Sequence, residues 1–158
     1  MTAEQLIHLL DLKPHPEGGY FCETYRGPSL IPGHQPSRHY STAIYYMLVP
    51  GAVSKMHRLG SDEIFHFYLG DPVTWVLLEN GGNWRKVVLG SDLGMGQTVQ
   101  WVVPAGTWFG GYLKEGGRFA LMGTTVAPGF DFEDFQLGSR DLLLKEFPGA
   151  EAEIMRLT

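Results

Sequence analysis

Short runs of β-forming residues alternate with turn residues through the middle of this sequence, from Gly18 to Val126. The runs are rich in Val, Tyr, Trp, Phe and Thr, and segments such as ENGGNW, LGDP and LKEGGR between them are typical of hairpin connections. The candidate strands are YFCETYR, TAIYYMLV, EIFHFYLG, VTWVLLE, WRKVVLG, TVQWVVP and RFALMGTTV. Strands at this spacing predict an antiparallel sandwich or barrel. No strand–helix–strand alternation occurs, which argues against a parallel sheet.

Helical patterns are confined to the two ends of the chain. Thr2 and Gln5 form a capping box before leucines at helical spacing, which predicts a helix over about residues 2–11. In the tail, the segment GSRDLLLKEFPG has a helical pattern with Ser139 as its N-cap. A helical segment is therefore predicted over about residues 139–157. With 158 residues, no internal repeat and no low-complexity linker, residues 1–158 are expected to form one all-β domain, with a β-barrel over about 18–127.

Charge and cysteine content exclude several classes of function. The formal net charge is −5 and the basic residues are scattered, so no nucleic-acid partner is expected. Cys22 is the single cysteine, which excludes an intrachain disulfide and a cysteine-based zinc site. No leader and no apolar run of roughly 18 residues is present, so neither secretion nor membrane association is expected, and the predicted location is the cytoplasm.

The segment GAVSKMHRLGSDEIFHFYLG, Gly51 to Gly70, places His57 and Glu63 a few residues apart. It fits the first motif of the cupin superfamily, except that Leu59 stands at the position of a second histidine. The segment VVPAGTWFGG resembles the second cupin motif through its Pro-x-Gly, but a phenylalanine, Phe109, occupies the histidine position.

Further blocks narrow this resemblance. HPEGGYFCETYR, STAIYYML, HRLGSDEIFHFYLGD, QWVVPAGTWFG and APGFDFEDFQLG, in this order over about residues 5 to 157, are similar to the little-characterised cupin-5 family. The resemblance implies a single jelly-roll barrel, or double-stranded β-helix, that is usually a homodimer. It implies no activity, because the superfamily includes dioxygenases, isomerases, epimerases, decarboxylases and storage proteins.

The cupin metal-ligand pattern is only half present. It would use His57, Glu63 and the positions of Leu59 and Phe109, and neither of those two side chains can coordinate a cation. No cofactor is therefore predicted. A divalent transition metal held by His57 and Glu63 would need a rearranged ligand set, with His39, His66 or Glu23 moving in.

His57 and Glu63 are instead predicted to form a proton-transfer pair on the inner face of the barrel. Burial raises the pKa of a carboxyl group and a nearby positive charge lowers it, so such a pair can exchange protons near neutral pH. The alternative is that the two side chains hydrogen-bond each other and organise the turn between them.

Six further residues are candidates for ligand binding, each with a structural alternative. Strand alternation places His66 on the face opposite Glu63, where its structural alternative is a hydrogen bond in a second layer of side chains or at a subunit contact. On the strand that contains Tyr45 and Tyr46, only one of the two can point inward. Gln100 lies within an apolar strand, where it faces either a ligand or solvent. Glu17, Glu23 and Arg26 either reach over the mouth or form an exposed ion-paired edge. The ligand-binding set is Glu23, Arg38, which suits an anionic group, Tyr45, His66, Gln100 and Trp108.

The sequence therefore predicts a pocket for a small polar organic ligand inside the barrel. Three functions remain open: a metal-independent isomerase, epimerase or lyase, a non-catalytic binding or sensing module, and a metal-dependent oxygenase with a rearranged ligand set.

Overall fold

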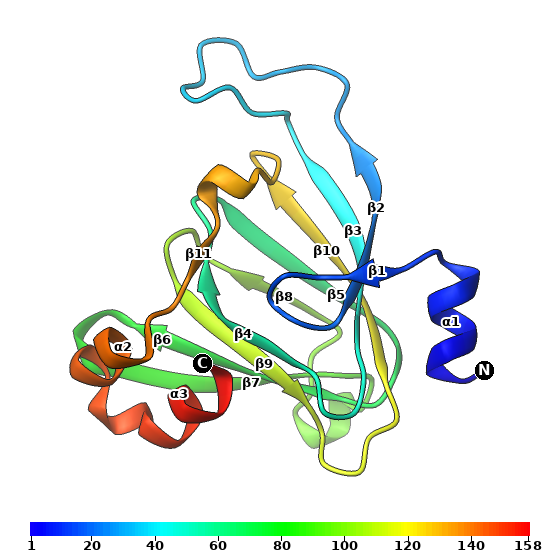
Figure 1. The fold of residues 1–158 in the computed structure, drawn as a ribbon, viewed down its shortest axis with the longest axis vertical. Coiled ribbons are helices and arrows are strands. Elements are labelled where there is room, and N and C mark those ends of the chain that lie inside the picture. The colour runs from blue at the N-terminus through cyan, green and yellow to red at the C-terminus, as the bar shows by residue number, and fades with distance from the viewer.

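Two antiparallel sheets pack face to face in the computed structural model, which describes residues 1–158 (Figure 1). One sheet has the strand order β1-β2-β3-β10-β5-β8 and the other β11-β4-β9-β6-β7. The strands are β1 (Lys13–Pro14), β2 (Tyr20–Arg26), β3 (Thr42–Leu48), β4 (Val53–Arg58), β5 (Asp62–Gly70), β6 (Val73–Glu79), β7 (Asn83–Leu89), β8 (Gln100–Val103), β9 (Trp108–Leu113), β10 (Ala120–Ala127) and β11 (Gln136–Leu137). No hydrogen-bonded ladder joins the sheets, so the predicted all-β jelly roll is confirmed and takes the form of a sandwich.

Every strand predicted from the alternating pattern is present, and two long strands were not predicted. These are β4 and β9, which carry the two motif segments. Strand β9 has the sequence WFGGYL, whose glycines resemble a turn. A Cβ atom on Gly111 would lie 2.6 Å from the Trp75 ring, so glycine here allows the backbone of β9 to approach that ring.

Short helices flank the sandwich at both ends of the chain. Helix α1 (Ala3–Leu9) has the predicted capping box between Thr2 and Gln5. Helices α2 (Arg140–Glu146) and α3 (Glu151–Leu157) form the predicted helical tail. The 3-10 turns are η1 (Asn80–Gly82), η2 (Leu93–Met95), η3 (Phe132–Asp134) and η4 (Pro148–Ala150). No helix of the protein has the length and apolar character needed to cross a membrane.

The buried side chains lie in three layers. Between the sheets, Phe65, Trp75 and Phe109 pack ring against ring in the largest cluster. Helices α2 and α3 cover the outer face of the sheet that contains β4, β9 and β6, while α1 covers the outer face of the other sheet (Figure 1). Strand β6 is buried on both faces for this reason, and its sequence is an apolar run rather than an alternating one.

Candidate functional site

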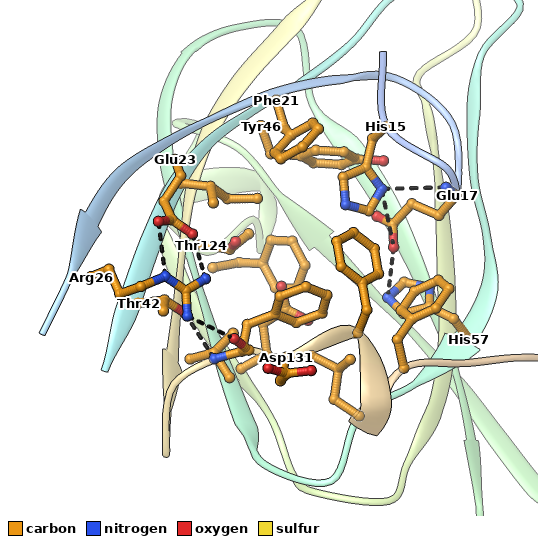
Figure 2. A pocket seen from close by; sticks show the side chains of 18 residues that line it. His15, Glu17, Phe21, Glu23, Arg26, Thr42, Tyr46, His57, Thr124 and Asp131 are labelled. Atoms are coloured by element: carbon orange, nitrogen blue, oxygen red, sulfur yellow. Dashed lines mark hydrogen bonds and ion pairs between the residues drawn. The ribbon is translucent and has the colours of Figure 1, made fainter. Parts of the chain in front are cut away.

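A cavity of about 160 Å³ opens between the sheets and is lined by 18 residues. Its walls come from the inner faces of β2, β3, β4, β5 and β10, from the turn before β2, and from the segment after β10 (Figure 2). By the same measure one water molecule needs about 10–15 Å³, so the cavity has room for a small organic molecule and not for a polymer.

His57 and Glu17 form a buried pair in the cavity wall. His57 Nε2 lies 3.1 Å from Glu17 Oε2, and His57 Nδ1 lies 2.6 Å from the carbonyl oxygen of Lys55. A carbonyl can only accept, so Nδ1 carries the hydrogen and Nε2 faces the carboxylate. Two bare acceptors at this distance would repel each other, so we infer that the His57–Glu17 ion pair carries one proton, on Nε2 or on Oε2. The Ser54 hydroxyl donates to the other oxygen of Glu17 at 3.0 Å.

His15 lies on the opposite side of Glu17 and is neutral. Its Nδ1 accepts the backbone N–H of Glu17 at 3.2 Å, which leaves the ring hydrogen on Nε2. Burial lowers the pKa of His15 from its ordinary value; the Glu17 carboxylate opposes this shift and His57 adds to it. The ring packs edge-on against Phe21 and Tyr46 (Figure 2).

Glu63 is the second acid of the cavity and has no cationic partner. Its side chain is buried, and Oε2 has no hydrogen-bond partner. Burial, and after it the charge of Glu17, raise the pKa of Glu63 to about 8, against the opposing effect of a hydrogen bond with Thr124. Glu63, which lines the cavity together with the His57–Glu17 pair, is therefore mostly a neutral carboxylic acid at pH 7.

The other end of the cavity carries an ion pair. Arg26 Nε and Nη2 donate to the two carboxylate oxygens of Glu23 at 3.0 and 2.6 Å, and Arg26 Nη1 donates to the carbonyl oxygen of Phe130 at 3.3 Å. Asp131 lies close enough for its charge to act on the same guanidinium. The predicted ligand residue Glu23 thus lines the cavity, with its carboxylate already matched by Arg26.

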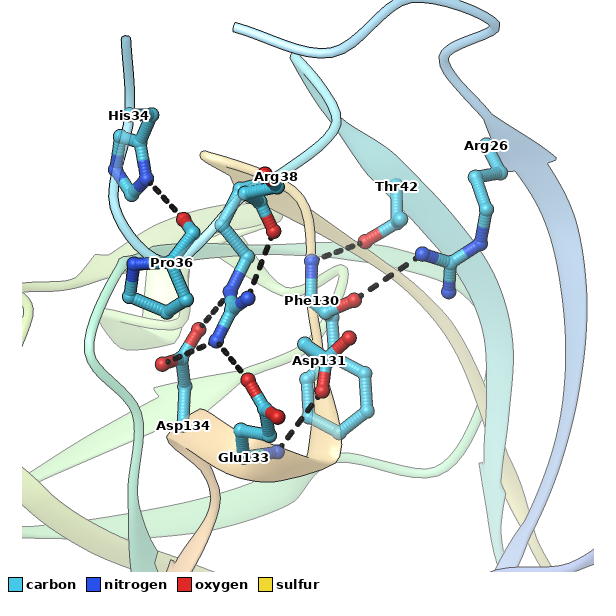
Figure 3. A network of polar contacts seen from close by, with 10 residues as sticks. Arg26, His34, Pro36, Arg38, Thr42, Phe130, Asp131, Glu133 and Asp134 are labelled. Carbon is cyan, nitrogen blue, oxygen red and sulfur yellow. Dashed lines mark hydrogen bonds and ion pairs between the residues drawn. The ribbon is translucent and has the colours of Figure 1, made fainter.

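A segment after β10, residues 128–135, closes one wall of the cavity and contributes Phe130, Asp131 and two further phenylalanines. Arg38 holds this segment from outside the cavity: Nε donates to Asp134 Oδ2 at 2.6 Å, and Nη2 donates to Asp134 Oδ1 and Glu133 (Figure 3). The Arg38 guanidinium lowers the pKa of Asp134 below its usual range. Arg38 therefore binds the protein's own carboxylates rather than an anionic ligand.

Replacing Arg38 with Met is expected to loosen this segment. Hydrogen–deuterium exchange of the amides in residues 128–138 should become about tenfold faster or more, because two carboxylates lose their partner, while exchange in β6 stays unchanged. Arg85→Met, which breaks an exposed ion pair with Glu79, is the matched control. Equal exchange in the two variants would contradict the role assigned to Arg38.

The structure brings three of the eight predicted site residues to the cavity. His57, Glu63 and Glu23 line it, and the other five, Arg38, Tyr45, His66, Gln100 and Trp108, do not.

Strand parity and packing explain the remaining four positions. On β3 the inward residue is Tyr46, whereas Tyr45 packs against Tyr68 on the outer face. His66 lies opposite Glu63 as parity predicts, and it bonds Gln100 and Thr125 on the outer face. A tryptophan, Trp108, stacks under the Arg58 guanidinium, away from the cavity.

Several cavity residues were not predicted from the sequence, or were predicted with two alternative roles. His15 and Glu17 precede β2 in a Pro- and Gly-rich turn, where no periodicity indicates which way a side chain points. Thr124 and Asp131 also line the cavity. The two ring nitrogens of His57 are occupied by Lys55 and Glu17, so the alternative in which His57 and Glu63 bond each other is not observed.

The residues present do not fit the metal-ligand set of the cupin motifs. Leu59 lines the cavity, and Phe109 packs against the His57 ring with the centroids 4.1 Å apart. No group of three or more His, Cys, Asp or Glu side chains is arranged to hold a cation. The expectation that no cofactor is used stays a prediction.

A protein-family model and a yeast protein both match most of this chain. The Cupin_5 family model, described as "Cupin superfamily (DUF985)", matches residues 4–138. The uncharacterized protein YML079W of Saccharomyces cerevisiae is 33% identical over 165 residues, which cover 95% of this chain and 82% of that protein.

Solved structures agree with this match. A hypothetical protein from Leishmania major has a TM-score of 0.93 at 32% identity, with 100% of this chain and 99% of that chain covered. Protein SO0799 from Shewanella oneidensis has a TM-score of 0.92 at 35% identity, with coverage of 100% and 98%. Oxalate decarboxylase from Bacillus subtilis has a TM-score of 0.57 at 16% identity over 92% of this chain and 37% of that chain, a likeness of fold alone.

Proposed function

Given that the chain belongs to the Cupin_5 family of the cupin superfamily, a membership that establishes the fold and leaves the activity open, we propose that it binds a small organic molecule between its sheets and moves a proton on it without a metal. The reaction class is that of an isomerase, epimerase or lyase. One observation carries the proposal: Glu63, buried and without a partner for Oε2, shares a cavity with a pair that holds a separate proton.

Glu63 is suited to exchange a proton with carbon. A carboxyl whose pKa is about 8 is partly ionised near neutral pH, and its ionised form is a stronger base than an ordinary carboxylate. Ionised Glu63 removes a proton from the carbon next to a carbonyl, and the electron pair of that C–H bond moves to the carbonyl oxygen.

Glu17 is suited to supply the matching proton to oxygen. His57 has no free ring nitrogen, so it acts through Glu17, whose carboxyl carries the shared proton when it is transferred from Nε2 to Oε2. This proton goes to the developing oxyanion, and the neutral His15 ring has its Nε2–H free to donate a hydrogen bond. Glu63 then returns its proton to the former carbonyl carbon, and the hydroxyl on the other carbon gives its proton back to Glu17 as the new carbonyl forms. This completes an isomerisation with no oxidant and no metal.

Exchange of carbon-bound hydrogen with solvent tests the proposal. In D₂O, the protein should incorporate deuterium next to the carbonyl of a bound hydroxy-aldehyde or hydroxy-ketone, read by NMR, with a rate that rises with pH up to about pH 8. Glu63→Gln and Glu17→Gln should each slow this exchange at least ~100-fold, as loss of a general acid or base does. Glu115→Gln, at an exposed turn, is the control.

Ligands that raise the melting temperature without any exchange would contradict the proton-transfer step and favour the binding module. The homodimer and the cytoplasmic location stay predictions.

A further inference from the structure

The charges that line the cavity are unequal in number, and the single guanidinium is committed to the protein's own groups. Four acids, Glu17, Glu23, Glu63 and Asp131, face a single guanidinium, that of Arg26. A ligand that carries a carboxylate or phosphate needs a cation or several free donors that are not committed to the protein's own acids.

At the mouth, Arg26 is already paired with the protein's own acid. Its Nε and Nη2 are bound to both oxygens of Glu23, and Nη1 is bound to a backbone carbonyl. Asp131 lies near the same guanidinium, so the three charges at this end sum to one negative charge. An incoming carboxylate would compete with Glu23 for this guanidinium and would approach the negative charge of Asp131.

At the inner end of the cavity, the His57–Glu17 pair and His15 carry no net charge. His57 and Glu17 share one proton, so the pair has no net charge. The His15 ring accepts the backbone N–H of Glu17 and is itself neutral. Glu63 has no cation beside it, and an anion placed against its unpartnered oxygen would oppose the ionisation that proton transfer needs.

The remaining wall is apolar and aromatic. The rings of Phe21, Phe65, Phe130, Phe132 and Phe135 line the cavity together with Tyr46, Leu59 and Val126. Such a wall buries a ring or an alkyl chain, while the acids and His15 offer hydrogen bonds to hydroxyl and carbonyl groups.

We propose that the cavity takes an uncharged hydroxy-carbonyl compound with an apolar body and rejects organic acids and phosphate esters of similar shape. The identification of this compound as a substrate rests on the proposed function, whereas the selection against anions depends only on the arrangement of charges.

A matched set of three probes separates charge from shape. They are 2-hydroxyacetophenone, which is uncharged, mandelate, which has the same ring with a carboxylate, and phenacyl phosphate. Calorimetric titration at pH 7 should give binding of the uncharged probe at least about tenfold tighter than either anion. Equal or tighter binding of mandelate would overturn the proposal, and so would the absence of any binding by 2-hydroxyacetophenone.

Two variants test the physical cause. Glu23→Gln leaves Arg26 without its bidentate partner and should tighten mandelate binding about tenfold, with less than about a twofold change for the uncharged probe. Asp131→Asn should act in the same direction, and it covers the case in which Glu23→Gln folds poorly. No gain for mandelate in either folded variant would contradict the charge argument.

The two proposals fail in different ways. Selective binding of 2-hydroxyacetophenone without deuterium incorporation at its CH₂ group would remove the proton-transfer function and leave the selectivity intact. Deuterium incorporation into a carbon acid that carries a carboxylate, with tighter binding of that anion, would do the reverse.

Discussion

Glu63→Gln is expected to stabilise the protein at alkaline pH and to flatten its dependence on pH. The pKa of Glu63 rises from 4.5 in the unfolded chain to about 8 in the fold, chiefly because the side chain is buried. The folded state therefore holds a proton that the unfolded state releases between these values. Stability from this group is complete below about pH 4.5 and is lost as the pH rises through about 8.

The size of the effect follows from the same shift. Each pKa unit corresponds to about 1.4 kcal/mol, so the gap in unfolding free energy between Glu63→Gln and the parent should grow by about 3 to 5 kcal/mol from pH 5 to pH 9. The glutamine amide is neutral and similar in size, which leaves the packing in place. Urea unfolding at pH 5, 7 and 9 measures the gap, with Glu115→Gln as the exposed control. Parallel stability curves for all three proteins would show that Glu63 ionises normally.

Gly18→Ala is expected to damage both the fold and the site. Gly18 has φ +114°, and a Cβ atom there would lie 2.0 Å from the carbonyl oxygen of Val53. The carbonyl of Gly18 accepts the Tyr46 hydroxyl, and the preceding residue is Glu17. The substitution should therefore move the turn that places Glu17 against His57, and cost about 4 kcal/mol or more of unfolding free energy.

Gly116→Ala separates the clash from the backbone strain. Gly116 also has positive φ, +73°, but no atom lies within 4 Å of the Cβ that an alanine would add, so its loss should be only about 1 to 2 kcal/mol. Urea unfolding gives both numbers, and an NMR titration of the His57 ring reports whether its Glu17 partner has moved. Equal losses in the two variants, with an unchanged His57 signal, would contradict the role of Gly18.

The sequence predicts most strands because alternation of side chains follows directly from the pleat of a half-buried sheet. It fails for β9, where Gly110 and Gly111 are present for close packing against Trp75 and the backbone of β4 rather than for a turn. A closed barrel and an open sandwich have the same alternation of inward and outward side chains. The sequence pattern therefore does not determine how the sheets are arranged.

The candidate site was predictable where a strand or a motif placed the side chain. Glu63 lies on the predicted strand β5, and His57, on β4, was identified by the cupin motif; both line the cavity. Loop residues were not predictable, because the path of a loop has no period: Glu17 reaches inward, while Arg38 turns outward to bind Asp134. Their roles depend on contacts between residues far apart in the sequence.

Glu63 is a buried carboxylic acid that stays protonated at pH 7 beside the His57–Glu17 pair. A ¹³C NMR titration of the Glu63 side-chain carboxyl, assigned by its loss in Glu63→Gln, measures this protonation. We expect a transition near pH 8. A transition near pH 4.5, as in an exposed glutamate, would contradict it.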